Sequence, residues 1–143
     1  MEIRKADSKD IAAIKKIADL LYLDILGFEW NKEDFIKGQI EKGEYYLAEE
    51  NGIAVGAISL RDRNGMIYIE TLVVAKDIQT RGIGRQLVEF AKQFARENNF
   101  KILRTTSFYE YGVKDFYIKQ GFKLLDEAGE YGGHKFHRLE FVL

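Results

Sequence analysis

The sequence predicts an α+β domain of three layers, in which a mixed central sheet of about seven strands carries helices on both faces. Three observations predict this fold class. Apolar stretches of strand length recur along the chain, Asn-Gly pairs separate some of them as hairpin turns, and amphipathic stretches with helical spacing lie between others. At 143 residues the chain can bury a substantial core, and we expect one domain that spans residues 1–143.

The N-terminal part predicts a short strand at residues 2–5 and then two helices. Asp7 or Ser8 can cap the first helix, because their side-chain oxygens accept hydrogen bonds from backbone N–H groups. Asn31 can cap the second helix in the same way, and Gly43 follows its end. Apolar residues at helical spacing mark the buried faces: Ile11, Ile14, Ile17, Ala18 and Leu21 in the first helix, and Phe35, Ile36 and Ile40 in the second.

Three strands follow as a meander, because turn-forming pairs separate them. Asn51-Gly52 and Asn64-Gly65 readily adopt the left-handed backbone of two-residue hairpin turns. The third strand is mostly apolar on both of its faces, which indicates a strand covered on both sides. The predicted strands are residues 44–49, 53–61 and 66–75. Strict alternation assigns Ile67, Ile69 and Val73 to one face of the third strand, and Met66, Tyr68, Leu72 and Val74 to the other.

The C-terminal part predicts a crossover and then a hairpin. A long helix at residues 82–98 separates the strand at 66–75 from a strand at 101–106, so these two strands should be parallel and joined by a right-handed connection. The remaining elements are a short helix at residues 111–120 and a last hairpin of strands 122–125 and 134–142. The predicted element order is therefore βααβββαβαββ.

Composition excludes several classes of function. The net charge is −1, so electrostatics favours neither nucleic acid nor an anionic membrane as a partner. No apolar run reaches membrane-spanning length, and the N-terminus is not a signal peptide. The chain has no cysteine, which excludes disulfides and thiolate metal sites and is typical of a cytoplasmic protein. His134 and His137 should point to opposite faces of a strand, so we predict no metal site.

One turn carries the clearest chemical signal. Gln79-Thr80-Arg81-Gly82-Ile83-Gly84 connects the third strand of the meander to the long helix. A helix N-terminus has N–H groups without intrahelical partners and the positive end of the helix dipole, so it attracts phosphate. Gly82 and Gly84 remove side chains that would hold a pyrophosphate away from these N–H groups, and Arg81 and Arg85 add positive charge.

Two common phosphate-binding motifs fit this turn poorly. The dinucleotide fingerprint needs a small residue three positions after its second glycine, where this chain has Leu87. A P-loop needs a Lys-Ser or Lys-Thr pair after its last glycine, where this chain has Arg85-Gln86. The spacing Gln-x-x-Gly-x-Gly after an aliphatic strand instead resembles the acyl-CoA-binding motif of the GNAT superfamily of N-acetyltransferases.

A second motif extends this resemblance. Phe116-Tyr117-Ile118-Lys119-Gln120-Gly121-Phe122 resembles the other GNAT signature, a helix that ends in Tyr-x-x-x-Gly-Phe before a strand. The resemblance implies the GNAT fold and an enzyme that transfers the acetyl group of acetyl-CoA to a primary amine of a small molecule or peptide. It also implies that main-chain groups of Leu72, Val73 and Val74 hold the pantetheine arm. The implied contacts to the pyrophosphate of coenzyme A come from Gln79, Thr80, Arg81, Gly82, Ile83, Gly84 and Arg85.

The resemblance implies two catalytic residues, Glu70 and Tyr117. An acid on this strand deprotonates the amine in many GNAT enzymes, and a carboxylate among apolar neighbours is costly unless it is hydrogen-bonded. The family's tyrosine protonates the departing sulfur, and a phenol with a pKa of about 10 suits a thiolate whose conjugate acid has a pKa of about 8.5. Two alternatives stay open: Glu70 orders water or binds substrate, and Tyr117 only packs beside Val113 and Phe116.

The acceptor side is predicted from the loop between the first two helices. Glu29 and Trp30 lie in that loop, and the alternative for Trp30, a core anchor, is the one that the sequence favours. Many family members carry an asparagine seven residues before the tyrosine, where this chain departs from the pattern with Glu110. If Glu29, Glu70 and Glu110 converge, we expect a cationic amine as the acceptor. A non-catalytic acyl-CoA-binding module, a protein lysine or N-terminal acetyltransferase, and a homodimer formed through the C-terminal strands stay open as alternatives.

Overall fold

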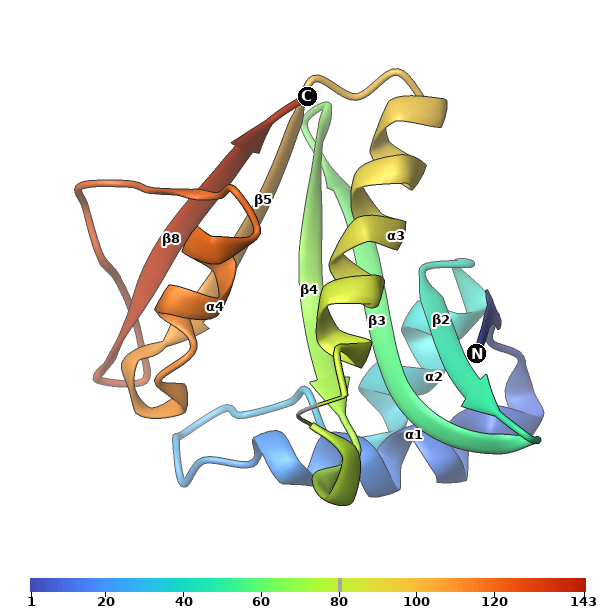
Figure 1. The fold of residues 1–143 in the computed structure, drawn as a ribbon. Coiled ribbons are helices and arrows are strands. Elements are labelled where there is room, and N and C mark those ends of the chain that lie inside the picture. The colour runs from blue at the N-terminus through green and yellow to red at the C-terminus, as the bar shows by residue number, and fades with distance from the viewer. Residues whose placement is uncertain (80) are drawn as a thin grey trace.

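The computed structural model describes residues 1–79 and 81–143, and within them eight strands form one mixed sheet (Figure 1). The strands are β1 (Glu2–Lys5), β2 (Tyr45–Glu50), β3 (Ile53–Arg63), β4 (Met66–Val74), β5 (Ile102–Phe108), β6 (Lys123–Leu124), β7 (Gly129–Tyr131) and β8 (His134–Val142). Their order in the sheet is β1-β2-β3-β4-β5-β8-β6, and β7 pairs with β8. Only β4 and β5 are parallel among the described pairs, as the crossover predicts.

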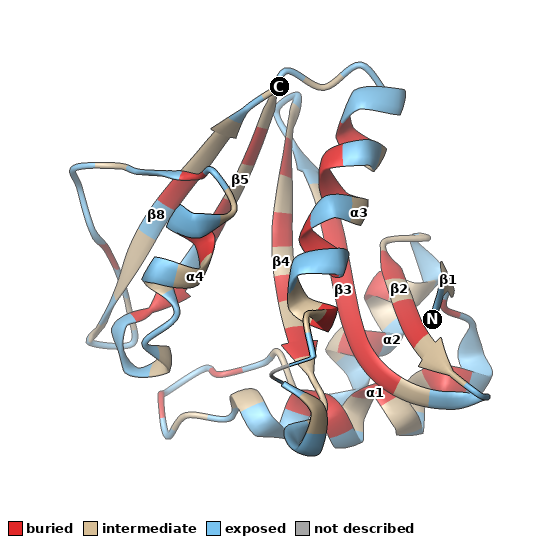
Figure 2. Ribbon diagram, in the orientation of Figure 1, coloured by how far each residue is buried: buried red, intermediate tan, exposed pale blue. Residues whose placement is uncertain are grey.

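Helices cover both faces of this sheet, which confirms the predicted fold class. The α-helices are α1 (Ile11–Ala18), α2 (Glu33–Glu41), α3 (Ile83–Glu97) and α4 (Lys114–Lys119), and single 3-10 turns are η1 (Ser8–Asp10), η2 (Asp19–Leu21), η3 (Lys76–Ile78) and η4 (Tyr109–Tyr111). One buried cluster joins α1 and α2 to the sheet, and a larger one joins α3 and α4 to it. Figure 2 shows the buried residues along β3, β4 and the inner side of α3. No helix in the described part of the chain is long and apolar enough to cross a membrane.

Both Asn-Gly pairs form the turns that the sequence predicts. The φ angles are 51° and 78° at Asn51 and Gly52, and 55° and 82° at Asn64 and Gly65. These are left-handed conformations, which two-residue hairpin turns require and which asparagine and glycine tolerate. The two turns therefore set the register of the β2-β3-β4 meander.

Some element boundaries differ from the prediction. Asn31 does not cap α2, because its side-chain amide donates to Asp19 instead (3.1 Å). The helix predicted at residues 111–120 is interrupted by Gly112, whose φ of 64° ends η4, so that α4 begins only at Lys114. β7 was not predicted, because three residues are too few to give a periodic pattern.

The start of the chain is held together by a buried carboxylate. Asp7 caps η1 as predicted, since its side chain accepts a hydrogen bond from the backbone N–H of Lys9 (2.9 Å). Asp10 in turn accepts from the backbone N–H of Asp7 (2.8 Å) and from two nitrogens of the Arg4 guanidinium (2.8 Å each). Hydrogen bonding to Arg4 lowers the pKa of Asp10.

A β-bulge at Glu70 shifts the alternation of side chains between the two faces of the sheet along β4. The register pairs on either side of it are Ser59 with Thr71 and Leu60 with Ile69. Glu70 is therefore the extra residue of the bulge. Ile67 and Ile69 pack in the α3 cluster, whereas Val73 packs in the cluster under α1 and α2. The predicted alternation, which placed these three on one face, is wrong because the bulge inserts one residue between them.

The parallel pair of β4 and β5 separates next to this bulge. Its register pairs are Ile67 with Leu103, Tyr68 with Arg104 and Ile69 with Thr105. At the last pair, Thr105 Oγ1 donates to the carbonyl of Ile69 (3.1 Å). Residues 71–74 remain paired with β3, but on the side of β5 they have no strand partner among the described residues. Figure 1 shows the two strands diverging from this point.

Candidate active site

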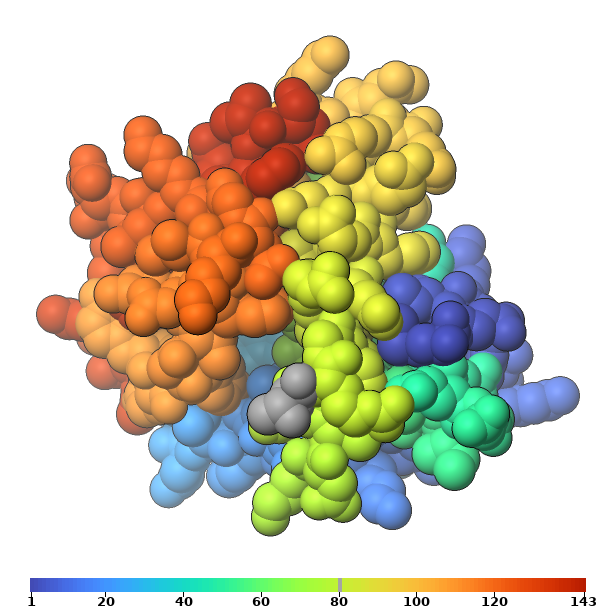
Figure 3. All heavy atoms as spheres, in the orientation of Figure 1, coloured from blue at the N-terminus to red at the C-terminus, as the bar shows by residue number. Residues whose placement is uncertain are grey.

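A cleft of about 680 Å³ opens where β4 and β5 separate. It is walled by β4 on one side, by β5, η4 and α4 on the other, and by the loop that leads from η2 to α2 at one end. Figure 3 shows the surface hollowed between the orange residues around α4 and the yellow-green residues that lead into α3. The predicted site residues that line the cleft are Glu29, Trp30, Glu70, Leu72, Val73, Val74, Gln79, Gly84 and Tyr117.

The edge of β4 supplies free backbone groups to the cleft. Leu72, Val73 and Val74 pair with β3 on one side and face the separation from β5 on the other. The side-chain amide of Gln79 donates to the carbonyl of Val74 (3.2 Å), which ties the turn before α3 to the end of the strand. An extended ligand could therefore pair with this edge as an additional strand would.

The first turn of α3 borders the same cleft. Gly82 precedes the helix with a φ of 79°, a left-handed backbone that glycine adopts without strain, and no described side chain caps the helix. The N–H of Gln86 makes the first intrahelical bond, to the carbonyl of Gly82 (3.1 Å), so the N–H groups of residues 83–85 precede the helical ladder. Gly84 lines the cleft, and a Cβ atom there would lie 3.3 Å from Cζ of Phe116.

The other residues predicted for this segment have different surroundings. Ile83 is 3% exposed and packs in the α3 cluster, so only its backbone can contact a ligand. Arg81 donates to Glu50 (2.9 Å), and neither Arg81 nor Arg85 lines the cleft. Thr80 lies outside the described residues. The backbone at the start of α3, rather than the two arginines, is therefore the stronger candidate for binding a diphosphate.

Glu70 contributes a carboxylate to the wall of the cleft. Its side chain is 13% exposed, and its Oε1 accepts hydrogen bonds from Arg63 (2.9 Å) and Arg61 (3.3 Å). The two guanidinium groups satisfy the requirement that a carboxylate in such a strand be hydrogen-bonded. Both of these hydrogen bonds go to Oε1, so within the described residues Oε2 of Glu70 accepts none and is available to a ligand or water.

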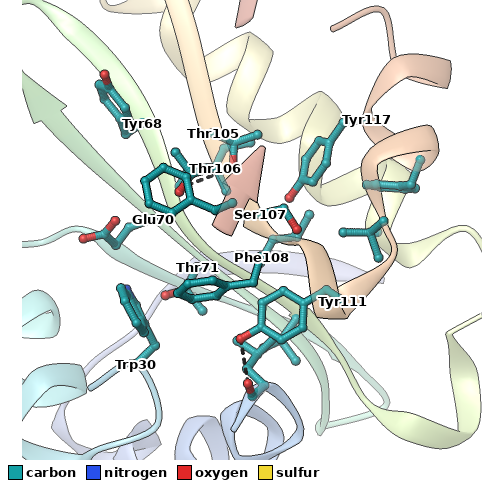
Figure 4. Close-up of a pocket in the computed structure, with 18 of the residues that line it drawn as sticks. Trp30, Tyr68, Glu70, Thr71, Thr105, Thr106, Ser107, Phe108, Tyr111 and Tyr117 are labelled. Atoms are coloured by element: carbon teal, nitrogen blue, oxygen red, sulfur yellow. Dashed lines mark hydrogen bonds between the residues drawn. The ribbon is translucent and has the colours of Figure 1, made fainter. Parts of the chain in front are cut away.

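Tyr117 lies on α4, across the cleft from Glu70 (Figure 4). The residue is 5% exposed, and its ring packs against Phe116 and Phe122 with centroid distances of 5.1 and 5.4 Å. Its hydroxyl nevertheless points toward the cleft in Figure 4. Burial raises the pKa of Tyr117 to about 12, although hydrogen bonding with Thr105 opposes the shift. The phenol is therefore protonated at neutral pH.

An aromatic wall closes the other end of the cleft. Trp30 packs edge-on against Tyr131 and Phe108, with centroid distances of 5.3 and 5.8 Å, and also lines the cleft. Trp30 thus combines the core position and the cleft position that the sequence left as alternatives. Glu29 beside it is exposed and lines the cleft. The Tyr111 hydroxyl donates to a carbonyl of η2 (2.6 Å), which fixes η4 against this end (Figure 4).

Glu110 lies on η4, but it is not among the residues that line the cleft. Its carboxylate pairs with His134 on β8, and this hydrogen bond lowers the pKa of Glu110. The other histidine, His137, stacks on Tyr109 at a centroid distance of 4.1 Å. The structure therefore brings Glu29 and Glu70 to one cleft and leaves Glu110 outside it.

The cleft also contains residues that were not predicted. Arg61 and Arg63 line it from the end of β3, opposite Tyr68 and Met66 in the register. A signal for them was present, because two arginines at alternate positions of one strand of a hairpin can both reach an acid on the other strand. The β5 residues of the cleft gave no such signal, since their role depends on where the sheet separates. They are Thr105, Thr106, Ser107 and Phe108.

Comparison with known protein families and sequences gives consistent matches. A family model described as an acetyltransferase (GNAT) domain matches residues 27–143. An aminoalkylphosphonate N-acetyltransferase of Salmonella typhimurium is 26% identical over 130 residues, which cover 85% of this chain and 84% of that protein. An uncharacterized N-acetyltransferase of Archaeoglobus fulgidus is 25% identical over 143 residues, with 90% of this chain and 97% of that protein covered.

A solved structure shares the fold. The PaiA N-acetyltransferase of Thermoplasma acidophilum, in complex with coenzyme A, matches with a TM-score of 0.79. The match covers 98% of each chain at 18% sequence identity.

Proposed function

The chain belongs to the GNAT family of acetyl-CoA-dependent N-acetyltransferases, and on this premise we propose that it acetylates a primary amine of a small molecule or peptide. The observation that carries the proposal is one cleft shared by a free strand edge, a helix start, a carboxylate and a phenol. In the proposed reaction the amine nitrogen attacks the thioester carbonyl directly. The new C–N bond replaces the C–S bond, and coenzyme A leaves as its thiol.

Acetyl-CoA is the donor of this family, and the cleft suits it. The free edge formed by Leu72, Val73 and Val74 would pair with the amide groups of the pantetheine arm. The N–H groups at the start of α3 would bind the diphosphate, where Gly84 leaves the backbone accessible. Backbone N–H groups of β4 would also polarise the thioester carbonyl as negative charge develops on its oxygen. Gln79 holds the connecting turn against Val74 and acts in this proposal as a positioning residue.

Glu70 and Tyr117 supply the two proton transfers of the proposed reaction. Glu70 accepts a proton from the amine through Oε2, directly or by way of a water molecule, while its Oε1 stays bound to the arginines. Tyr117 donates its proton to the departing sulfur and later regains one from solvent. The opposite placement of the two side chains in the cleft supports this division of roles (Figure 4).

The size of the acceptor distinguishes two versions of this function. The relative in Salmonella typhimurium is named for aminoalkylphosphonates, which supports a small molecule as the acceptor here. The aromatic wall around Trp30 also narrows the acceptor end of the cleft. A protein lysine or N-terminal amine is the competing acceptor, and it enters the same experiment as a separate arm.

Release of coenzyme A from acetyl-CoA by the purified protein, measured with a panel of small amines and lysine peptides, tests the proposal. We expect turnover with at least one small amine, whereas faster turnover of the lysine peptides would favour the competing protein or peptide acceptor. Glu70→Gln should lower kcat at least about tenfold, because the amide cannot take up the proton, while the Kd for acetyl-CoA stays within about twofold. Tight acetyl-CoA binding without turnover of any amine would instead indicate a non-catalytic binding module.

A further inference from the structure

The charges that line the cleft are not those of a site for a polycation. Arg61 and Arg63 both line it, with side chains that are 36% and 46% exposed, and both contact the same oxygen of Glu70. One carboxylate therefore faces two guanidinium groups at this place. Glu29 is the only other acid among the described residues of the lining, and it lies at the loop beside Trp30.

The two guanidinium groups keep most of their hydrogen-bonding capacity. Each has five N–H donors in a planar fork, and among the residues that the structure describes each donates one hydrogen bond, to Glu70. Arg63 also lies over the ring of Tyr68, 5.3 Å from its centroid, which restrains its orientation. A fork of this kind matches the geometry of a carboxylate or phosphonate group, which can accept two parallel hydrogen bonds.

The arginines lie on β3 beside the first half of β4, and this position fits the geometry of the proposed reaction. From the free edge at Leu72 back toward the start of β4, the strand passes Glu70 and then reaches Tyr68, which lies opposite Arg61. Leu72 and Tyr68 are four residues apart, so this segment of strand is about 13 Å long. An amine placed near Glu70 would thus have the arginines on the side away from the thioester, within reach of a short substituent.

We propose that the acceptor amine carries an acidic oxyanion group, a carboxylate or a phosphonate, and that Arg61 and Arg63 bind this group. The inference rests on the proposed acetyltransferase function and specifies its substrate class. It replaces the cationic acceptor that three converging acids would have indicated, since Glu110 does not line the cleft. A polyamine would bring additional positive charge next to two guanidinium groups, which is unfavourable.

Matched pairs of acceptors test the inference. The first arm compares amino acids with their C-terminal amides, and the second compares aminoalkylphosphonates with alkylamines of the same length. We expect kcat/KM to favour the acidic member at least about tenfold, a difference typical of a charged hydrogen-bonded contact. The ratio should fall to near one in the double variant Arg61→Gln/Arg63→Gln. Because any effect of the substitutions on Glu70 applies to both members of a pair, the ratio isolates recognition of the acidic group.

Arg96→Gln is the matched control, since Arg96 is exposed near the end of α3 and does not line the cleft. This variant loses the same charge and should keep the ratio of the wild type. A ratio near one in the wild type, or a ratio unchanged in the double variant, would overturn the inference while leaving the acetyltransferase function intact.

A binding measurement distinguishes an error in the proposed acceptor class from an error in the proposed acetyltransferase function. Calorimetry with coenzyme A present compares an N-acetyl amino acid with its amide, and requires no turnover. We expect at least tenfold tighter binding of the acid, and loss of that preference in Arg61→Gln/Arg63→Gln. Absence of turnover with every amine would contradict the proposed function, whereas equal affinity for the acid and the amide would contradict the acidic acceptor.

Discussion

Tyr117 combines two properties that a sequence pattern presents as alternatives. Its ring packs between Phe116 and Phe122, as the spacing of an apolar stripe predicts, and its hydroxyl faces the cleft, as the GNAT signature predicts. The sequence could not combine them, because it gives the direction of neither the ring nor the hydroxyl. Burial is the physical link between the two, since it raises the pKa and keeps the proton on the phenol.

If Tyr117 is the proton donor proposed above, Tyr117→Phe should lower kcat at least about tenfold and leave the Kd for acetyl-CoA unchanged within about twofold, because the substitution removes only the hydroxyl. Stopped-flow or steady-state kinetics, together with calorimetry, measure the two quantities. Equal activity of Tyr117→Phe and the wild type would restrict Tyr117 to packing.

The raised pKa of Tyr117 predicts how kcat depends on pH on the alkaline side. A group with a pKa of about 12 stays protonated below about pH 11, so Tyr117 should contribute no loss of kcat between pH 7 and pH 10. The alkaline side of the kcat profile should therefore have the same shape in the wild type and in Tyr117→Phe over this range, with lower values throughout in the variant. A decline near pH 9 that disappears in Tyr117→Phe would contradict this assignment.

Asp10 should make stability depend on pH on the acidic side. Hydrogen bonding to Arg4 lowers its pKa in the folded protein, so its contribution is present above the unfolded pKa of about 3.9 and is lost as the pH falls through the folded value. Asp10→Asn should reduce the free energy of unfolding by about 1–3 kcal/mol at pH 7 and by less at pH 3. Urea denaturation at both pH values measures this, and the exposed Asp126→Asn is the control.

At the scale of elements, the start of α3 depends on small residues for two different reasons. Gly82 needs a left-handed backbone, whereas Gly84 needs space, because a Cβ atom there would lie 3.3 Å from Phe116. Position 84 is therefore the better one to test, since its backbone needs no unusual φ. Any added group at this position lies at the border of the cleft.

Gly84→Val should weaken coenzyme A binding at least about tenfold, because the branched side chain covers the backbone N–H groups at the helix start. Calorimetry measures the affinity, and circular dichroism checks that the fold is retained. Gly38→Ala is the control in a helix far from this chemistry, since a Cβ there meets no atom within 4 Å. It should leave the affinity unchanged and stabilise the protein by about 0.5–1 kcal/mol. Unchanged affinity in Gly84→Val would contradict the assignment of the diphosphate site.

Local signals predicted most elements, and tertiary structure decided the rest. Both Asn-Gly turns, the parallel crossover and the α3 start followed from short patterns with a direct physical cause. The bulge at Glu70 did not, because an extra residue in a strand is visible only when its partner strand is known. Because of this one extra residue, Val73 faces α1 and α2, on the opposite face of the sheet from Ile67 and Ile69.

At the scale of the whole molecule, the cleft is a property of the sheet rather than of any single motif. The sequence predicted Glu70, Tyr117 and the glycine turn separately, but the separation of β4 from β5 is what gathers them into one cleft. Arg61 and Arg63 line the same cleft because the register of β3 with β4 places them opposite Tyr68 and Met66.

Coenzyme A should stabilise the region in which the two strands separate. A ligand that pairs with the free edge of β4 should slow hydrogen exchange at Leu72, Val73 and Val74, whereas α1 should change little. At a concentration of 100 times Kd, it should add about 2.7 kcal/mol to the free energy of unfolding and raise Tm by roughly 5–10 °C. Exchange mass spectrometry and calorimetry measure the two effects. Protection confined to other regions would contradict the proposed pairing.

The separation of β4 and β5 also divides the chain at one point along its length. Residues 1–98 contain β1 to β4 with α1 to α3, and residues 101–143 contain the remaining strands with α4. In the part of the chain that the structure describes, only three register pairs connect the two sets of strands. A polypeptide cut in the turn after α3 would therefore yield two fragments whose strands are each contiguous. Their association, measured with fluorescent labels on the two fragments, should be promoted by the acetyl donor. Acetyl-CoA would then control the assembly of a split enzyme.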